Sequence, residues 1–212
     1  MSLLDSLTAE PRQRLPQPSY LVEEISHRVM NEYSAAIGDL SLAAGRSASD
    51  QTRATLNRVA ERLRAHAEAH CALLAPAPDE GPIDLADYLG RICASMTKAL
   101  LADREIRLLA EMDEVWLDAG RCWRIGLIVA ELIRNAVRHG LAGRSGCVRV
   151  ALKRATDGVS CMVSDNGAAA TEFRRGRGRR LIEMLADELG GTVSWRFTPA
   201  GCIAELAFPD AG

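Results

Sequence analysis

A carboxylate and a carboxamide lie four residues apart in the segment ELIRNAVRHG, which runs from Glu131 to Gly140. The apolar residues around them recur at helical spacing, so we expect Glu131 and Asn135 on one face of an amphipathic helix that packs on a sheet. Polar groups beside an apolar face carry a desolvation cost unless they have a partner. A hydrated Mg²⁺ ion with phosphates would be such a partner, because the ion prefers oxygen ligands and usually keeps several waters. The alternative interpretation is an ordinary helix with a solvated polar edge.

His27 is a second residue with usable chemistry, in the segment EISHRVMN from Glu24 to Asn31. The apolar spacing in and after this segment predicts a helix-pairing seam, and His27 falls on the side of the helix away from it. An exposed neutral imidazole is a usable nucleophile near pH 7, and its attack on a γ-phosphate would give a phosphohistidine. Glu24 could orient the ring, and Arg28 could hold phosphate oxygens. The alternative is a surface histidine on a coiled-coil helix.

Short glycine-containing segments follow further along the chain. Asp165-Asn166-Gly167 comes directly after a predicted strand, and it is also a common turn sequence. Gly176 and Gly178 precede a predicted helix whose free N–H groups could face phosphates. Arginines crowd the same stretch, where they could grip phosphates or form a solvated basic face or a docking surface for an acidic regulator. These arginines are Arg174, Arg175, Arg177, Arg179 and Arg180.

Two long helices are expected to present His27. The apolar spacing predicts helices over about 19–44 and 50–74, with Gly45 and a Ser/Asp-rich stretch as the turn between them. Two helices joined by a short loop form an antiparallel hairpin, and a lone hairpin cannot cover its apolar seams. Pairing with a second copy into a four-helix bundle would cover them. The sequence therefore predicts a flexible leader at 1–18, a dimerising helical hairpin at 19–75 and a Pro/Gly-rich linker at 76–83.

The remaining part, 84–212, is expected to hold the Glu131 helix against a sheet. Asp84 can cap a helix that runs to about Leu101, and Gly190-Gly191 can end a helix that begins at about Arg177. Helices and mostly antiparallel strands in this order favour an α+β fold class, in which the hairpin is followed by a two-layer α/β sandwich with helices on one face of the sheet. The predicted strands are 105–111, 115–117, 147–154, 159–164, 192–197 and 202–208.

The composition of the 212 residues argues against several classes of function. A net charge of −2 and an aromatic content of 4% speak against nucleic acid as the main partner. The cysteines are scattered without a C-x-x-C pair, which is typical of a reducing compartment. There is no signal sequence and no apolar run long enough to span a bilayer. We therefore expect a cytoplasmic protein that binds neither nucleic acid nor membrane.

In their order along the chain, these segments resemble the motif boxes of bacterial two-component sensor histidine kinases. EISHRVMN resembles the phosphoacceptor box H-R-x-x-N of one branch of the family, and ELIRNAVRHG resembles its N box. Asp165-Asn166-Gly167 resembles the first glycine box, and GRGRRLIEMLADELGG, from Gly176 to Gly191, resembles the second. The branch is related to the HWE group. A histidine and a tryptophan define that group. This chain has Ala130 in place of the histidine and no tryptophan in the strand VSCMVS, so it is not placed inside the group.

The resemblance implies a histidine kinase that phosphorylates itself from ATP and passes the phosphoryl group to an aspartate in the receiver domain of a response regulator. It implies a homodimer in which the hairpin at 19–75 is followed by a Bergerat-type ATP-binding sandwich at 84–212, with ATP and Mg²⁺ as cofactors. Because no sensor domain is recognised in the chain, either input would come from a separate sensor protein or the protein is not a sensor.

The resemblance also implies a role for individual residues. His27 would be the phosphoacceptor and Glu131 a base or a holder of water, while Asn135 would bind Mg²⁺. The adenine amine would donate to Asp165, and Gly167 would let the backbone approach the base closely. The phosphates would be met by Arg138, His139, Gly176 and Gly178.

Two departures from the family pattern support other readings. Ala169 stands where the first glycine box usually has a second glycine, and only AAATEFRR separates Gly167 from Gly176, where the family normally carries a longer lid over the nucleotide. A histidine phosphotransferase that no longer needs ATP, or a non-catalytic module that docks regulators, would also fit a shortened lid. Retention of Glu131, Asn135 and Asp165 together favours the kinase, because a relay has no need of metal or adenine contacts.

Overall fold

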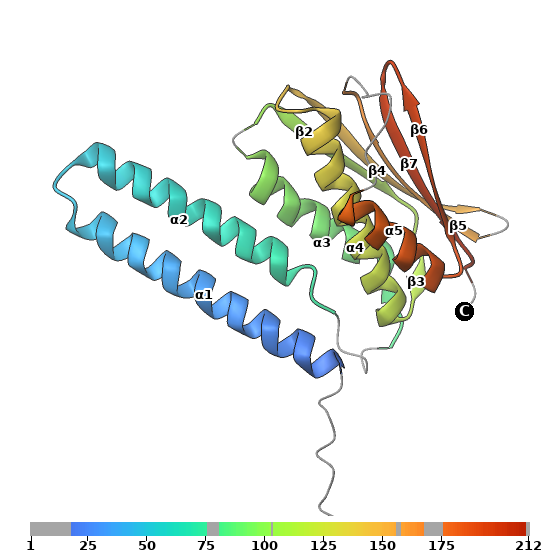
Figure 1. The fold of residues 1–212 in the computed structure, drawn as a ribbon, viewed down its shortest axis with the longest axis horizontal. Coiled ribbons are helices and arrows are strands. Elements are labelled where there is room, and N and C mark those ends of the chain that lie inside the picture. The colour runs from blue at the N-terminus through green and yellow to red at the C-terminus, as the bar shows by residue number, and fades with distance from the viewer. Residues whose placement is uncertain (1–17, 76–80, 103, 156–157, 168–175, 211–212) are drawn as a thin grey trace, which may run out of the picture.

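The computed structural model describes residues 18–75, 81–102, 104–155, 158–167 and 176–210, with side chains from Glu24 onward. A hairpin of two antiparallel helices stands beside an α/β sandwich (Figure 1). This arrangement confirms the predicted α+β fold. The predicted leader up to residue 17 and positions 76–80 of the predicted linker lie outside the described residues.

The hairpin consists of α1 (Pro18–Arg46) and α2 (Asp50–Cys71). Ser49 caps α2, because its side chain accepts a hydrogen bond from the N–H of Thr52. Where the helices face each other their contact includes small buried residues, among them Ser26 and Ala44 on α1 and Ala60 on α2. Within the described ranges, no helix is both long and apolar enough to cross a membrane.

A five-stranded sheet in the order β2-β4-β5-β7-β6 forms one layer of the sandwich. Every neighbouring pair is antiparallel except β2 and β4, which run parallel. Along β5, Val159, Cys161, Val163 and Asp165 are the buried positions of a strict alternation, so Asp165 belongs to the face of the sheet that carries the core. The strands are β2 (Ile106–Met112), β4 (Gly146–Ala155), β5 (Gly158–Asp165), β6 (Thr192–Thr198) and β7 (Gly201–Phe208).

The helices α3, α4 and α5 cover one face of this sheet and leave the other face open (Figure 1). Asp84 caps α3 by accepting from the N–H of Ala86 at 2.9 Å, as predicted, and Asp118 caps α4 by accepting from the N–H of Arg121 at 2.9 Å. Both α3 and α4 end in a π-helical turn. The bounds are α3 (Leu85–Met96), η1 (Thr97–Leu101), α4 (Ala119–Asn135), η2 (Ala136–Gly140) and α5 (Arg177–Glu188), with a short ribbon of β1 (Ile83–Asp84) and β3 (Trp116–Leu117).

The hairpin contacts the sandwich through α2, which packs on η1 and α3. At the end of α2, the indole N–H of Trp123 donates to the backbone carbonyl of Leu73 at 3.0 Å. Lys98 of η1 forms an ion pair with Glu68 of α2 at 3.2 Å. A half-buried donor that pairs with a carbonyl resists separation more than an exposed ion pair does, so the Trp123 hydrogen bond is the stronger of the two connections.

Candidate functional site

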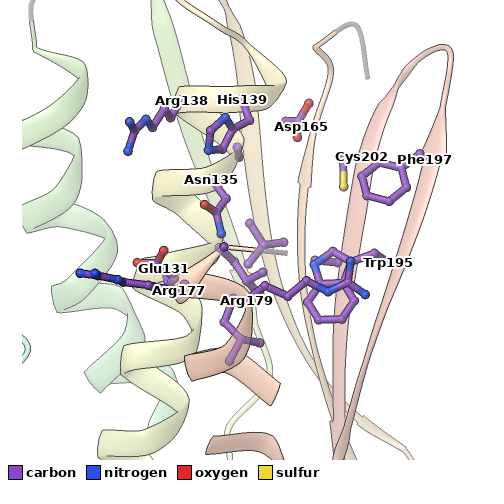
Figure 2. A pocket seen from close by; sticks show the side chains of 17 residues that line it. Glu131, Asn135, Arg138, His139, Asp165, Arg177, Arg179, Trp195, Phe197 and Cys202 are labelled. Carbon is purple, nitrogen blue, oxygen red and sulfur yellow. The ribbon is translucent and has the colours of Figure 1, made fainter. Parts of the chain in front are cut away.

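A cavity of about 280 Å³ lies between the helical layer and the sheet. Its walls come from α4, η2, the start of α5 and the strands β5, β6 and β7 (Figure 2). The cavity brings together most of the residues that the sequence singled out, although they come from segments far apart in the chain. Those that line it are Glu131, Asn135, Arg138, His139, Asp165, Gly176 and Gly178.

Glu131 and Asn135 share the face of α4 that borders the cavity. Both are half-buried, whereas Leu132 and Ile133 beside them are buried in the core. This is the expected result of an apolar helix face packed on a sheet with a polar edge at its margin. Glu131 also lies 3.4 Å from Arg134 in an ion pair one turn along the helix. Two oxygen-bearing side chains are therefore held one turn apart at the edge of the cavity.

Asp165 lines the cavity and is only 9% exposed. Burial raises the pKa of its carboxyl group, and hydrogen bonds from the backbone N–H groups of Gly167 and Cys202 and the charge of Arg144 partly oppose that effect. The Gly167 N–H donates to Asp165 Oδ1 at 2.9 Å. One carboxylate oxygen is thus fixed by the backbone. The carboxyl group is held in one orientation toward the cavity.

Glycine is required where η2 and the end of β5 meet. A Cβ at Gly140 would come within 2.5 Å of the Asp165 carboxyl group, and a Cβ at Gly167 would lie 1.9 Å from the carbonyl oxygen of Gly140. Neither side chain could be accommodated without moving backbone or the short buried carboxylate. These two glycines therefore allow Asp165 to occupy its place beneath the last turn of η2.

The start of α5 forms another wall of the cavity. The first N–H groups of any helix lack an intrahelical partner, and Gly176, which precedes α5 with extended backbone, offers them no side-chain cap. A Cβ at Gly178 would lie 2.0 Å from Glu131 Oε1. The absence of a side chain at position 178 lets α5 begin directly against the Glu131 carboxylate, which brings the two motif segments together.

The sheet side of the cavity contains residues that the sequence did not single out. Trp195 and Phe197 of β6 and Cys202 of β7 line it (Figure 2). The Arg179 guanidinium lies 4.3 Å from the centroid of the Trp195 ring and donates to Glu183 at 3.0 Å. The available signal was the alternation of Val193, Trp195 and Phe197, which assigns them to one face of the strand. Burial also raises the pKa of the Cys202 thiol to about 11.

His27 lies outside this cavity, exposed on α1 as predicted. Next to it, Arg28 Nε and Glu24 Oε1 form an ion pair at 2.8 Å, so the two flanking residues engage each other one turn apart. The structure thus places the candidate nucleophile on the hairpin and the remaining candidate residues in the sandwich.

Several sequence-based expectations concern residues 168–175, which lie outside the described residues. They are the effect of Ala169, the shortened lid, and the contribution of Arg174 and Arg175. Of the other arginines in that group, Arg177 and Arg180 are exposed and Arg179 is engaged with Trp195. In the described ranges, no group of three or more His, Cys, Asp or Glu residues could hold a metal ion. A metal at Asn135 would thus need ligands from a bound molecule or water.

The two sides of the cavity differ in chemical character. The sheet side combines aromatic and apolar side chains with a single fixed carboxylate, which suits a flat ring that can donate a hydrogen bond. The opposite side carries Glu131, Asn135 and Arg138, which suits an anionic group and a cation. Figure 2 shows Arg138 and Arg177 pointing away from the sheet, whereas Trp195 and Phe197 lie along it. The cavity is therefore suited to a ligand with a ring at one end and negative charge at the other.

Both the sandwich and the hairpin match models of known protein families. A model described as "Histidine kinase-like ATPase domain" matches residues 97–206, and a model described as "Histidine kinase" matches residues 24–100. The first match contains every cavity residue discussed above, and the second contains His27. The order of the two matches is that of the hairpin and the sandwich.

Relatives and solved structures agree with this assignment. The sensor histidine kinase PdtaS of Mycolicibacterium smegmatis is 26% identical over 188 residues, which cover 85% of this chain and 37% of that protein. The chain thus spans little more than a third of that relative's length. The histidine kinase domain of the Erythrobacter litoralis EL346 blue-light activated kinase has a TM-score of 0.59 at 22% identity, covering 84% of this chain and 95% of that one. A bacterial phosphotransferase also has a TM-score of 0.59, at 15% identity, covering 93% and 100% respectively. At these identities the two structures demonstrate a common fold.

Proposed function

The chain belongs to the histidine kinase-like ATPase domain family, and on this premise we propose that it is a protein-histidine kinase that phosphorylates His27 from ATP. The observation that carries the proposal is the convergence of Glu131, Asn135, Arg138 and Asp165 in one cavity with two chemically different sides. A phosphoacceptor match that includes an exposed histidine supports the second half of the reaction. In this proposal 19–75 is the phosphoacceptor unit and 84–212 the nucleotide-binding unit.

Adenine would occupy the sheet side of the cavity. Its exocyclic amine would donate to the Asp165 carboxylate, which also accepts from the backbone N–H groups of Gly167 and Cys202. The Trp195 and Phe197 rings and the Cys202 side chain would exclude water from the base. The phosphates would then extend toward Asn135, Arg138 and the N-terminus of α5, where uncapped N–H groups favour negative charge.

Asn135 would hold Mg²⁺ through its side-chain oxygen, with Glu131 positioned to accept a hydrogen bond from one of the ion's waters. Their shared, half-buried face at the rim of the cavity fits such an ion, which usually takes few protein ligands and completes its shell with phosphates and water. When bound, the ion would neutralise charge that develops on the phosphates during transfer. The chain's own contribution is to position the nucleotide and exclude water, the chief requirements of phosphoryl transfer.

His27 would accept the γ-phosphoryl group from this nucleotide. An imidazole nitrogen would form a bond to the γ-phosphorus while the bond from that phosphorus to the β–γ bridging oxygen breaks, and the electron pair would leave with ADP. The other ring nitrogen would lose its proton to solvent as the ring returns to neutrality. An aspartate in the receiver domain of a response regulator would then take the phosphoryl group, regenerating the imidazole.

A homodimer would complete the hairpin. Ile25 is 60% exposed and Val59 39% exposed, although both belong to apolar seams of their helices. A second copy packed against these seams would bury them in a four-helix bundle. The same assembly would leave His27 exposed, because it lies on another face of α1.

An ATP-independent histidine phosphotransferase is the second candidate. The observation that favours it is the likeness to the bacterial phosphotransferase over 93% of this chain, which equals the fold likeness to the kinase domain. In that case His27 would receive its phosphoryl group from a response regulator, and the cavity would bind no nucleotide. Nucleotide binding therefore separates the two candidates.

The test is the affinity of the full chain for ATP, measured by calorimetry with and without Mg²⁺. We expect binding by the wild type that is tighter with Mg²⁺, and an Asn135→Ala variant that loses about tenfold or more of the Mg²⁺-dependent affinity, since a hydrogen bond or ligand to a charged group is worth roughly 1.5–3 kcal/mol. A folded control, Asn57→Ala on the exposed surface of α2, should bind as the wild type does.

Unchanged affinity in Asn135→Ala would remove Asn135 from the metal site. No nucleotide binding by the folded wild type would contradict the kinase and favour the phosphotransferase, whose direct test is transfer of label from a phosphorylated receiver domain to His27.

A further inference from the structure

A second hollow adjoins the cavity on the side of α4 that faces η1. It measures about 650 Å³ and shares Glu131, Asn135 and Arg138 with the cavity, so these residues form a common wall. Beyond that wall the hollow is bordered by Arg134 of α4, Leu100 of η1 and Arg104 from the turn after η1. We call this hollow the arginine recess. A ligand that fills the cavity and extends past Asn135 would enter it.

The arginine recess carries a concentrated positive charge. Arg104, Arg134 and Arg138 border it, and Glu131 is the only acidic residue among those that line it. Glu131 is paired with Arg134 at 3.4 Å. In the described part of the chain, no ion pair engages Arg104 or Arg138. The three guanidinium groups outnumber the one carboxylate, so the recess has a net positive charge and an anion with several oxygens would stabilise it.

Different elements position these arginines. Arg134 and Arg138 lie one turn apart at the junction of α4 and η2. Arg104 is held at the end of η1, where its backbone N–H donates to the carbonyl of Leu101 at 2.9 Å. Arg138 points away from the sheet in Figure 2, toward the side on which the recess lies. A phosphate between these elements would be approached from two sides.

We propose that Arg104 and Arg134, together with Arg138, bind the terminal phosphate of ATP, and that this contact makes the protein distinguish ATP from ADP. The inference rests on the proposed nucleotide site. With adenine at Asp165 and the inner phosphates at Asn135, the terminal phosphate is the part of the ligand that lies beyond the wall shared with the recess. ADP lacks that group. The recess thereby supplies phosphate contacts that do not depend on residues 168–175.

The experiment compares a non-hydrolysable ATP analogue, AMP-PNP, with ADP. Both are titrated with Mg²⁺ into the full chain by calorimetry. For Arg104→Gln we expect the AMP-PNP affinity to fall by about five- to tenfold, a loss typical of one partly exposed charge-assisted contact, while the ADP affinity stays within about twofold. Arg134→Gln should act in the same direction. The Arg134→Gln substitution also frees Glu131 from its ion pair, and Glu131 lines the cavity that would hold ADP. The ADP affinity of this variant therefore reports whether the substitution disturbs the cavity as well as the recess.

Arg149→Gln is the matched control, because Arg149 is exposed on the open face of the sheet, away from the helical layer. It should leave both affinities unchanged, and circular dichroism should show all variants folded. An equal loss for AMP-PNP and ADP in Arg104→Gln, or no loss for either, overturns the inference. If the wild type binds ADP and AMP-PNP equally, the inference fails while the nucleotide site stands; if it binds neither, both fail.

Discussion

Asp165 shows how single residues shape the proposed binding site. A carboxylate in a buried position is costly, and the chain offsets that cost with backbone donors at Gly167 and Cys202 instead of a close ion pair. Glycine at positions 140 and 167 provides the space for it. Such a group is poorly suited to stabilising the fold, because burial disfavours its charged form. Its placement is better explained by a ligand that donates a hydrogen bond to it.

Asp165→Asn should separate stability from binding. The amide keeps the acceptor for the Gly167 N–H and removes a buried charge, so the free energy of unfolding near pH 7 should equal or exceed that of the wild type. Its NH₂ group would oppose the adenine amine, and ATP affinity should fall by about 10- to 100-fold, the range expected for losing a hydrogen bond to a charged acceptor. Calorimetry and denaturant unfolding measure the two effects. Asp187→Asn, exposed on α5, is the control.

The difference in stability between Asp165→Asn and the wild type should depend on pH, because burial raises the pKa of the Asp165 carboxyl group. The folded protein holds the Asp165 proton more tightly than the unfolded chain does, so the linked stabilisation is complete below the unfolded pKa of about 3.9 and is lost as pH rises through the higher folded pKa. The unfolding free energy of Asp165→Asn relative to wild type should therefore rise with pH across this window. A variant much less stable than wild type at pH 7 would show that Asp165 supports the fold.

Among the residues that line the cavity, the polar ones can be predicted from the sequence more readily than the apolar ones. Glu131, Asn135 and Asp165 could be singled out because a polar side chain next to an apolar run needs a reason. Trp195, Phe197 and Cys202 could not, because an aromatic or small apolar residue in a strand is expected wherever the strand is buried. These three residues line the cavity only because of the register in which β6 pairs with β7 and the packing of α5 against β6.

The exposed apolar residues of the α1–α2 hairpin explain why we expect it to pair with a second copy. Its seam on α1 is divided, since Val29, Tyr33 and Leu40 are half-buried against α2 while Ile25 and Ala36 are exposed. Ile25, Leu42 and Val59 are all exposed on the hairpin, and several exposed apolar side chains on one pair of helices favour a surface that another helix covers.

Ile25→Glu should weaken the proposed dimer. The introduced carboxylate would be buried without a partner in the four-helix bundle, a cost of several kcal/mol that corresponds to about a hundredfold or greater rise in the dissociation constant. Sedimentation velocity over a range of protein concentrations measures it. Ala35→Glu, exposed on another face of α1, should behave as the wild type. Equal association by Ile25→Glu and wild type would place the interface elsewhere.

Element boundaries were predicted closely where a side chain defines them. Asp84 begins α3 as expected, and Gly190 follows α5 with a φ of 66°. The π-helical turns η1 and η2 were not predicted, because a local widening of a helix leaves the apolar spacing almost unchanged. Nor was the parallel pairing of β2 and β4, since alternation in a strand carries no information on its partner's direction.

For the whole molecule, the position of the hairpin limits how the reaction can proceed. α2 packs on η1 and α3, and α1 lies on the side of α2 away from the sandwich (Figure 1). His27 is therefore separated from the cavity by a helix in this arrangement. The proposed transfer would require the sandwich to leave this position or to serve His27 of a partner subunit. The contacts at Trp123 and Lys98 would have to break in the first case.

The sequence predicts the two units but not their contact. The hairpin and the sandwich can each be predicted from the local spacing of their apolar residues. The packing of α2 on η1 involves charged residues such as Glu68 and Lys98, which the sequence does not distinguish from other surface residues. Their pairing is too weak to be specified by charge pattern alone.

The most direct test of the proposed kinase activity is phosphorylation of the purified full chain by γ-labelled ATP with Mg²⁺. We expect acid-labile, base-stable label on the wild type, which is the behaviour of phosphohistidine, and none on His27→Gln, while the variant keeps the fold and oligomeric state of the wild type. The substitution removes only an exposed side chain, so loss of label would identify His27 as the acceptor. Label on His27→Gln at the wild-type level, or no label on a wild type that binds Mg·ATP, would contradict the account.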